Sequence, residues 1–393
     1  MTLVQIIIII FTGLSAFFRI LEVLAILRTI KTMPFLEKLE AVDIKNPPKL
    51  SVIITACNEA QSLEKAMELR LQDNYPNLEF ILIDDRSSDG TREIARKIAG
   101  KDNRVKLIRI DELPGGWLGK VHAMHRGVKQ ATGDWFLFSD ADVHVKPGTL
   151  NRVMAFCRSK NLDQLAIVPE FYKGKFFADT AISVFLKALI AWSRSWKIKD
   201  PESTAFGGAG AFNLVRRTAF EKTKGFEWLK LEVIDDLTLG QMIKRTGGRS
   251  DMINGRGYVG VRWYSSFREM SIGMGRAVFV GIPNFGVTKL ILLSSLTFTL
   301  DIIPYIILVP MGIPYLPTAG VVIILLTFLS SIVVSRFTNH PLLPTFLLLV
   351  GHIIVFIVSV KSAVTALIKG GIVWRGTFYS TKMLKKGRRF TIF

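Results

Sequence analysis

The sequence predicts an α/β protein with a mainly parallel sheet, in a chain that also carries membrane helices. Segments typical of strands and of helices alternate between residues 48 and 260, and such alternation is typical of a parallel sheet covered by helices on both faces. Long apolar segments precede and follow this region. Apolar residues make up 49% of the 393 positions, so a membrane protein is the first class to consider.

The N-terminal segment is expected to be a transmembrane anchor. Residues 3–18 include no charged side chain, and the apolar run continues to Leu27 past only Arg19 and Glu22. A helix needs about 20 apolar residues to cross a bilayer. A cleaved signal peptide is the alternative, but no basic region precedes Arg19 and no small-residue cleavage site follows the apolar core. We therefore expect residues 1–28 to remain as an anchor.

The polar region over residues 48–264 is expected to form the α/β domain. Its predicted elements are a strand within 50–59, a helix over 59–72, a strand and turn over 78–91, a helix over 91–100, a strand over 104–111 and a strand in GDWFLFSDADV at 133–143. In parallel sheets, ligands bind beyond the carboxyl ends of the strands. Asp84, Asp85, Asp140 and Asp142 lie at such ends, so we expect them to meet at one edge of the sheet.

Two segments resemble amphipathic helices of a membrane interface, at residues 176–199 and 265–285. Both carry basic residues beside aromatic ones, a pattern typical of helices that lie along lipid headgroups. An ordinary core helix is the alternative for each. Three apolar blocks follow, at 290–309, 318–335 and 342–360. We therefore expect residues 288–368 to form transmembrane or re-entrant helices.

The basic tail over residues 369–393 leaves the topology ambiguous. Its basic stretch KMLKKGRRF at 382–390 favours the cytoplasmic side. Three complete late spans after a cytoplasmic α/β domain would instead put the tail outside. One late block is therefore expected to be re-entrant or interfacial, and Asp301 with Pro304, or His352, marks the candidate blocks.

The net charge of +19 is compatible with nucleic acid, an anionic membrane surface or a phosphorylated substrate. No nucleic-acid-binding motif is visible, and strand-end aspartates would repel phosphates unless a metal intervened. We therefore expect no nucleic-acid partner. Cys57 and Cys157 have neither zinc-site spacing nor a nearby His, so two buried thiols are expected.

The stretch SDAD suggests a metal–diphosphate site. Mg²⁺ or Mn²⁺ prefers carboxylate oxygens, and typically binds one or two of them together with phosphates of a substrate. Asp140 and Asp142 at a strand end suit such a site, and IDDRSSDGT at 83–91 supplies carboxylates and hydroxyls that can bind a base and a ribose. Aspartates are common in turns, so SDAD alone is weak support.

The motifs of the polar region, taken in order, resemble those of the membrane-bound family 2 glycosyltransferases. They are TACNEA at 55–60, LIDDRSSDGT at 82–91, FSDADV at 138–143, FGGAGAFNLVRR at 206–217, VIDDLTLG at 233–240 and VRWY at 261–264. The resemblance covers nearly all of residues 48–265. It implies a GT-A fold, a nucleotide-sugar donor such as a UDP-sugar, and inverting transfer to a hydroxyl or phosphate.

The resemblance also implies roles for single residues. Asp85, with Asp84 beside it, corresponds to the aspartate that contacts uridine. Asp142 corresponds to the direct metal ligand, with Asp140 nearer the ribose and sugar and also at the metal. Asp236 occupies the place of the general base, and Asp235 replaces the usual Glu before it. Such a base is chemically required, because the acceptor must lose its proton on the face opposite the leaving diphosphate.

Further site residues follow from the same motifs and from two shorter likenesses. PGGWLGKVHAM at 114–124 resembles a segment of the subgroup that glycosylates lipids such as carotenoid and hopanoid derivatives, and WRGTFY at 374–379 resembles a segment of that subgroup and of ceramide glucosyltransferases. The remaining expected donor residues are Ala56, Asn58, Glu59, Lys120 and Arg262. The expected acceptor residues are Gly207, Gly208, Trp263, Trp374, Arg375 and Tyr379.

One departure from the family bears on the product. Processive polymerases of the family have Gln-x-x-Arg-Trp, and Val259 stands here in place of the Gln. The sequence therefore favours transfer of a single sugar to a membrane lipid, at the cytoplasmic face of a prokaryotic inner membrane. A processive polysaccharide synthase is the first alternative. The second is a non-enzymatic membrane protein whose basic surface binds anionic lipid or nucleic acid.

Overall fold

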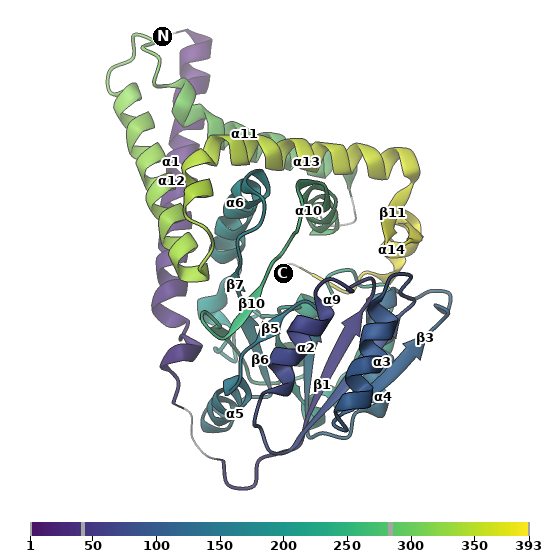
Figure 1. The fold of residues 1–393 in the computed structure, drawn as a ribbon. Coiled ribbons are helices and arrows are strands. Elements are labelled where there is room, and N and C mark those ends of the chain that lie inside the picture. The colour runs from purple at the N-terminus through teal and green to yellow at the C-terminus, as the bar shows by residue number, and fades with distance from the viewer. Residues whose placement is uncertain (1, 41–43, 282–285, 392–393) are drawn as a thin grey trace. The chain divides into compact units, whose positions relative to one another are not determined.

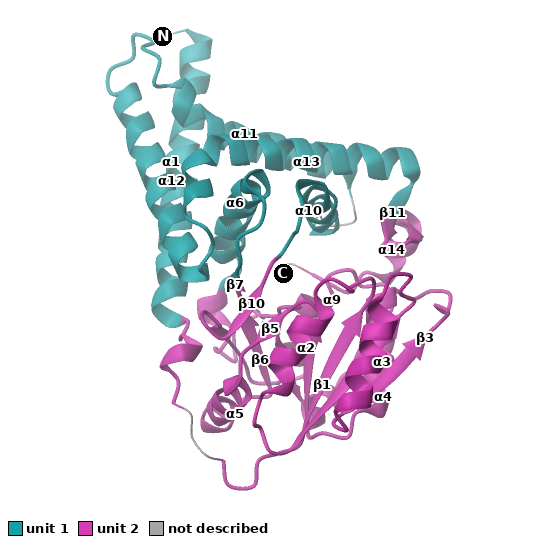
Figure 2. Ribbon diagram, viewed as in Figure 1, with its two compact units in different colours: residues 1–32, 171–194, 263–372 teal, residues 33–170, 195–262, 373–393 magenta. Residues whose placement is uncertain are grey.

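The computed structural model describes residues 2–40, 44–281 and 286–391. The end of the predicted amphipathic segment, residues 282–285, and the outermost residues of the predicted anchor and tail, Met1 and 392–393, lie outside the described residues. The chain divides into two compact units (Figure 2). The sheet unit comprises 33–170, 195–262 and 373–393, and the helical unit comprises 1–32, 171–194 and 263–372.

The sheet unit is built on a seven-stranded sheet in the order β3-β2-β1-β4-β8-β6-β9 (Figure 1). The strands are β1 Leu50–Ala56, β2 Leu78–Asp85, β3 Val105–Ile110, β4 Trp135–Asp140, β6 Gln164–Val168, β8 Asn213–Arg216 and β9 Ser250–Asn254. Only β8 runs antiparallel to its neighbours. The mainly parallel α/β sheet expected from the sequence is confirmed.

Short elements complete the sheet unit. Its helices are α2 Leu63–Leu71, α3 Thr91–Lys101, α4 Gly119–Gln130, α5 Thr149–Ser159, α7 Arg217–Glu221, α8 Gly225–Trp228, α9 Asp235–Arg245 and α14 Thr381–Gly387. A second sheet joins β5 His144–Val145, β10 Val259–Val261 and β7 Glu170–Phe171, and β11 Gly371–Trp374 pairs with β12 Thr377–Ser380. Helix α4 lies tightly on the sheet, because a Cβ at Gly127 would be 2.5 Å from Ile53 Cγ2.

The strand register explains why acidic residues gather at one edge. Every residue of β1 and of β2 is buried, as expected for central strands of a parallel sheet. Ala56 at the end of β1 pairs with Asp84 of β2, and Thr55 pairs with Asp140 of β4. Asp84 and Asp140 therefore flank the carboxyl end of β1, which is the edge predicted from the sequence.

The helical unit contains the apolar segments. Its helices are α1 Leu3–Thr32, α6 Phe176–Trp192, α10 Phe267–Gly281, α11 Val287–Ile306, α12 Leu316–Thr338 and α13 Leu348–Lys369, the last preceded by a 3-10 turn at Leu343–Leu347. Five segments of the described chain are long and apolar enough to cross a membrane, one more than the four apolar blocks recognised in the sequence. They are Leu3–Thr32, Phe176–Lys197, Val287–Ile306, Leu316–Thr338 and Leu343–Lys369.

Five titratable residues that interrupt these apolar helices form one cluster of ion pairs. Arg19 of α1 forms ion pairs with Glu22 and, at 2.7 Å, with Asp301 of α11. Lys187 of α6 lies 3.6 Å from Glu22, and His352 of α13 lies 3.6 Å from Asp301. Because an unpaired charge is costly in a membrane, this cluster explains how the helices tolerate the residues that the sequence marked as exceptions.

The two units divide the chain differently from the predicted ranges. Residues 171–194, inside the predicted α/β range 48–264, group with the apolar helices, and residues 373–391 of the predicted tail group with the sheet. The tail is held because Glu232 Oε2 accepts hydrogen bonds from the backbone amides of Arg389, at 2.6 Å, and Phe390, at 2.8 Å. Local sequence patterns do not encode contacts between such distant segments.

Candidate active site

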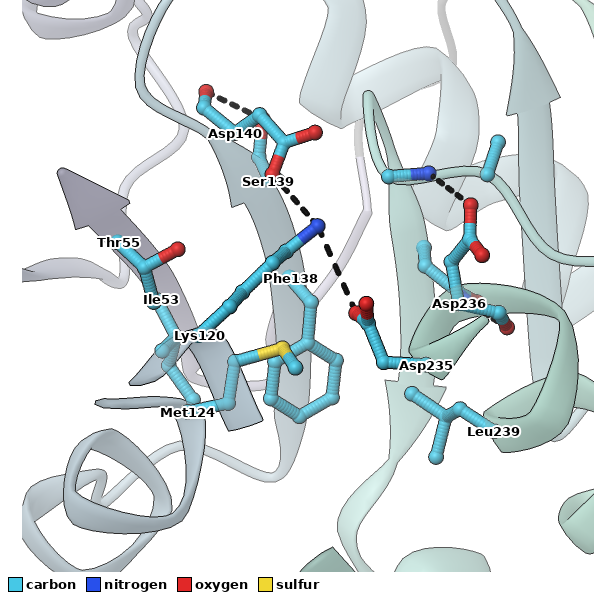
Figure 3. A pocket seen from close by; sticks show the side chains of 13 residues that line it. Ile53, Thr55, Lys120, Met124, Phe138, Ser139, Asp140, Asp235, Asp236 and Leu239 are labelled. Carbon is cyan, nitrogen blue, oxygen red and sulfur yellow. Dashed lines mark hydrogen bonds and ion pairs between the residues drawn. The ribbon is translucent and has the colours of Figure 1, made fainter. Parts of the chain in front are cut away.

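A lysine and three aspartates converge at the carboxyl edge of the sheet (Figure 3). The Nζ of Lys120, in the first turn of α4, lies 2.8 Å from Oδ1 of Asp140 and 3.5 Å from Oδ2 of Asp235. Asp140 ends β4, and Asp235 and Asp236 begin α9. These residues line one pocket at this edge. The structure thus brings together residues from three of the motifs.

The ionisation of Lys120 and Asp235 depends on this arrangement. Burial lowers the pKa of Lys120, but the charges of Asp140, Asp235 and Asp236 outweigh it and raise that pKa above its ordinary value. Burial raises the pKa of Asp235 to about 7, although Lys120 opposes the shift. Lys120 is therefore a permanent cation here, whereas the Asp235 carboxyl titrates near neutral pH.

Backbone amides orient the carboxylate of Asp236. Its Oδ2 accepts a hydrogen bond of 2.8 Å from the amide of Gly210, and its Oδ1 accepts one of 2.8 Å from Leu237. Glycine is required beside it, because a Cβ at Gly208 would lie 2.1 Å from the carbonyl oxygen of Asp236. A Cβ at Gly210 would likewise lie 2.6 Å from Oδ2 of Asp140. The Gly-rich motif therefore allows the two acidic motifs to approach each other.

The second aspartate of the SDAD motif is held in a strongly acidic environment. Burial, followed by the charges of Asp140 and Glu59, raises the pKa of Asp142 to about 7. Beneath it, Arg70 of α2 is buried and donates hydrogen bonds to the carbonyl oxygen of Asp140, at 2.6 Å, and to Ser139 Oγ, at 2.9 Å. Arg70 was not expected from the sequence; the only signal is a basic residue on the buried face of a helix.

These carboxylates fit a divalent ion that a substrate helps to bind. Across the described residues, no three His, Cys, Asp or Glu side chains are grouped to hold a metal by themselves. Mg²⁺ and Mn²⁺ commonly bind to one or two carboxylates and complete their coordination with substrate phosphates and water. A cation beside Asp140 and Asp142 would relieve the repulsion between carboxylates that adds to burial in raising the pKa of Asp142.

The residues expected to bind the nucleoside form a compact turn region. Asp84 accepts hydrogen bonds from Arg92 Nε, at 2.9 Å, and from the amide of Ser87, at 3.3 Å. Asp85 is fully buried, and Arg86 Nε donates to its Oδ1 at 2.8 Å. Gly119 is necessary here, because a Cβ would lie 2.5 Å from Asp85 Oδ2. Both aspartates are thus already paired with arginines.

The neighbouring loop brings the TACNEA motif to the same place. Asn58 has a left-handed backbone with φ of 59°. The side-chain oxygen of Asn58 accepts a hydrogen bond of 2.8 Å from the backbone amide of Ser88. The backbone amide of Asn58 donates to Ser87 Oγ at 3.1 Å. Ala56 is buried at the end of β1, and the amide of Glu59 donates to Thr91 Oγ1 at 2.7 Å. The loops after β1 and β2 are therefore joined by hydrogen bonds.

The C-terminal hairpin contributes to a second cavity beside the first. Its lining includes Lys120, Asp235, Trp374 and Arg375. Tyr379 is buried nearby, where the backbone of Gly119 forms a hydrogen bond with its hydroxyl. The residues expected from WRGTFY are thus located at the site, although the sequence alone could not place them there.

Three other expected residues lie elsewhere or act indirectly. Arg262 is exposed at the end of the sheet unit. Trp263 belongs to the helical unit, where it stacks on Phe171 and Tyr264 with centroid distances of 5.1 and 5.8 Å. Gly207 lies under α9, and it is Gly240 of that helix that allows the close packing, because a Cβ at Gly240 would lie 1.8 Å from the Gly207 carbonyl oxygen.

Comparisons with known proteins agree with this geometry. Residues 51–223 match the family model for glycosyl transferase family 2. The 4,4'-diaponeurosporenoate glycosyltransferase of Staphylococcus haemolyticus is 28% identical over 241 residues, which cover 60% of this chain and 62% of the relative. The GalNAc(5)-diNAcBac-PP-undecaprenol beta-1,3-glucosyltransferase of Campylobacter jejuni is 33% identical over 107 residues, covering 27% and 34%. The alignments thus span less than two thirds of each relative.

A solved structure shares the fold. The mannosyltransferase PcManGT of Pyrobaculum calidifontis, solved in complex with GDP-Man and Mn2+, has a TM-score of 0.56 at 15% identity and covers 93% of this chain and 99% of its own. The likeness shows that this chain has a GT-A-type fold. The match of residues 51–223 to the glycosyl transferase family 2 model agrees with the class of protein that the sequence motifs indicated. The non-enzymatic alternative is set aside.

Proposed function

We propose that this protein transfers a single sugar, with inversion, from a UDP-sugar to a lipid acceptor at the cytoplasmic face of a prokaryotic inner membrane. The observation that carries the proposal is the cluster in which Lys120 lies 2.8 Å from Asp140 and 3.5 Å from Asp235. It joins a metal–diphosphate motif at the end of β4 to a base motif at the start of α9. Donor and acceptor chemistry can therefore occur in adjacent positions.

In the proposed mechanism, Asp236 is the general base. Its carboxylate is held by two backbone amides, so it can accept the proton of an acceptor hydroxyl without reorienting. Asp142 and Asp140 would hold Mg²⁺ or Mn²⁺, which supplies positive charge to the donor diphosphate when bound. Lys120 adds a fixed cation beside that diphosphate. Asp85 and the Asn58 loop bind the nucleoside and orient the sugar.

A lipid acceptor agrees with both the relatives and the helices. The Staphylococcus relative is named for 4,4'-diaponeurosporenoate and the Campylobacter relative for a saccharide on PP-undecaprenol. Exposed apolar side chains cover much of α1, including Ile7, Ile10 and Phe17, as expected for a helix surrounded by lipid. An acceptor dissolved in the same bilayer would reach the enzyme by lateral diffusion.

The division into units supports a specific membrane topology. The sheet unit contains residues both before and after α6, and both before and after the three late helices. If this unit lies on the cytoplasmic face, each segment that leaves the unit and returns to it, residues 171–194 and 263–372, must cross the membrane an even number of times. The single helix α6 then cannot cross, and only two of the three late helices can. The uncharged loop 307–315 favours α11 and α12 as the spans, whereas α13 exposes Lys361 within its length.

The processive alternative depends on the number of sugars added. Val259 replaces the family's Gln, and α1, α11 and α12 as the proposed spans leave few helices from which to build a polymer channel. Mass spectrometry of the product is expected to show one added sugar per acceptor. A long ladder of sugar additions would favour a polysaccharide synthase.

A donor screen tests the proposal directly. The purified full chain in detergent would be given lipid extract, Mn²⁺ and individual UDP- and GDP-sugars, and release of nucleoside diphosphate would be measured. Release with a UDP-sugar that requires extracted lipid is the expected result. Release that is equally fast without lipid would contradict the proposed lipid acceptor. Release only with a GDP-sugar would contradict the proposed UDP-sugar donor.

A further inference from the structure

We infer that Arg375 binds the diphosphate of the nucleotide-sugar donor and stabilises it as the leaving group, together with Lys120. This inference rests on the proposed function and deepens it. It assigns to the donor a residue that the sequence motif associates with the acceptor. It also extends the donor site to a hairpin that lies outside the matched domain of residues 51–223.

The cavity that holds Arg375 is suited to an anion. Lys120 and Arg375 both line it, and Asp235 is its only acidic lining residue among those described. The remaining lining includes Gly119, Lys120 and Val121 from the first turn of α4. The positive end of a helix of this length favours negative charge. Because Lys120 already pairs with Asp140 and Asp235, Arg375 is the cation in this lining for which no ion pair is described.

Arg375 itself has unused hydrogen-bonding capacity. Its Nη1 is buried and has no hydrogen-bond partner in the described part of the chain. A buried donor without a partner costs free energy. A ligand oxygen that accepts a hydrogen bond from this nitrogen would remove that cost. A guanidinium is also the side chain whose geometry best matches two phosphate oxygens.

The hairpin is fixed to the donor side of the site. Arg86, which pairs with Asp85, also donates from Nη1 to Thr377 Oγ1 at 3.3 Å. The hydroxyl of Tyr379 forms a hydrogen bond with the backbone of Gly119. Arg375 has a left-handed backbone with φ of 45°, at the turn between β11 and β12. The hydrogen bond to Arg86 therefore holds the hairpin beside the loop after β2, which is expected to bind the nucleoside.

The pKa of the Cys57 thiol also indicates that Arg375 lies near the loop after β1. Burial raises the pKa of the Cys57 thiol, and Arg375 is the largest of the opposing influences, ahead of Arg86. Cys57 lies between β1 and Asn58, inside the TACNEA motif. The charge of Arg375 thus acts on the same loop that is expected to bind the donor.

The proposed step is balanced without any further reactant. The acceptor oxygen forms a bond to the anomeric carbon while the bond from that carbon to the diphosphate oxygen breaks. The electron pair of the broken bond stays on the diphosphate, and the acceptor proton goes to Asp236. Negative charge therefore develops on the diphosphate, where cations from Arg375 and Lys120 stabilise the transition state more than the ground state.

The test is nucleotide binding to the full chain in detergent, measured by calorimetry with UDP, GDP, UMP and GMP in the presence of Mn²⁺. The variants are Arg375→Gln, Arg375→Lys and a matched control, Lys385→Gln, which removes a charge from exposed α14 in the same segment. Arg375→Gln should weaken diphosphate binding by roughly 10- to 100-fold, as expected for a charged hydrogen bond. Monophosphate binding should change much less, Arg375→Lys should be intermediate, and the control should match the parent.

Each other outcome has a definite meaning. Unchanged diphosphate affinity in a folded Arg375→Gln variant, with a raised KM for lipid, would overturn the inference in favour of an acceptor role. An equal loss in Lys385→Gln would reduce the effect to general charge and would also overturn it. If the parent binds neither UDP nor GDP, the proposed donor class fails first; if the parent binds one of them and the variant binds it equally well, only the role of Arg375 fails. Unfolding temperatures of all variants check that the chain is folded.

Discussion

Lys120 Nζ lies 2.8 Å from Asp140 Oδ1, and this ion pair connects helix α4 to the strand end that carries the SDAD motif. The same ammonium lies 3.5 Å from Asp235 at the start of α9. One side chain therefore balances carboxylates from two motifs that are about a hundred positions apart in the sequence. Without it, these carboxylates would face each other at close range with no cation among them.

The first prediction concerns this cation. Lys120→Met should destabilise the sheet unit by about 3–5 kcal/mol, because removing one partner of a buried ion pair leaves uncompensated charge. Lys120→Arg should recover much of that stability, since it keeps the charge. Thermal unfolding of both variants in the same detergent measures the effect. If Lys120→Met unfolds at the parental temperature, the ion pairs do not matter for stability.

The second prediction concerns the divalent metal. Mn²⁺ should raise the unfolding temperature of the parent, because a cation relieves the repulsion among Asp140, Asp142 and Glu59. Asp142→Asn should lose most of this increase and abolish transfer, and EDTA should abolish transfer reversibly in the parent. Undiminished transfer in EDTA would remove the metal from the mechanism.

The third prediction separates the base from the nucleoside site. Asp236→Asn should slow single-turnover transfer by roughly 10²–10⁴-fold, while the affinity for UDP in Mn²⁺ hardly changes. Asp85→Asn should weaken UDP binding itself, because that contact exists before any chemistry occurs. Calorimetry and rapid quenching on both variants provide the comparison. Poor UDP binding by Asp236→Asn, or transfer at the parental rate, would contradict the assignment of the base.

The fourth prediction concerns pH. Burial raises the pKa of Asp235 to about 7, so the folded protein retains a proton that the unfolded chain loses near pH 4. Stability should consequently fall as the pH rises from about 4 to 7. Asp235→Asn lacks this ionisation, so its unfolding temperature should fall less than that of the parent between pH 5.5 and pH 8. A difference of several degrees is expected, at about 2–4 °C for each kcal/mol. Parallel curves would contradict the buried ionisation.

The fifth prediction concerns topology. Single cysteines at Lys160, Lys199 and Lys385, which are exposed in the sheet unit before α6, after α6 and after α13, should all react with an impermeant reagent from the same face of the membrane. A cysteine at Tyr315, between α11 and α12, should react from the opposite face. The parent supplies the background, since Cys57 and Cys157 are buried. Opposite labelling of Lys160→Cys and Lys199→Cys would mean that α6 crosses.

The strands and the acidic edge could be predicted because their causes are local. Continuous apolar runs end at Asp84 and at Asp140, and parallel packing alone brings such ends together. The observed register, with Asp84 and Asp140 on either side of the end of β1, follows from that rule. Helix α9 was not predicted, although Asp235 and Asp236 in its first turn agree with the preference for negative charge at a helix N-terminus.

The grouping of distant segments could not be predicted, because it depends on tertiary contacts. Gln241 of α9 donates to the carbonyl oxygen of Thr391 at 2.6 Å, across 150 positions of sequence. Glu232 anchors the amides of Arg389 and Phe390 in the same way. A basic tail next to apolar helices is typical of a segment at the membrane surface. No local sequence signal distinguishes such a tail from a tail that folds back onto the sheet. Arg70 was missed for the same reason.

The hairpin that carries Trp374 and Arg375 is translated after all five apolar helices. A ribosome producing this chain therefore completes the matched domain of residues 51–223 long before it completes the wall of the second cavity. If Arg375 binds the donor, a nascent chain should bind nucleotide sugar only weakly until its membrane helices have left the ribosome. The order of synthesis would thereby keep an uninserted chain from wasting donor in the cytosol.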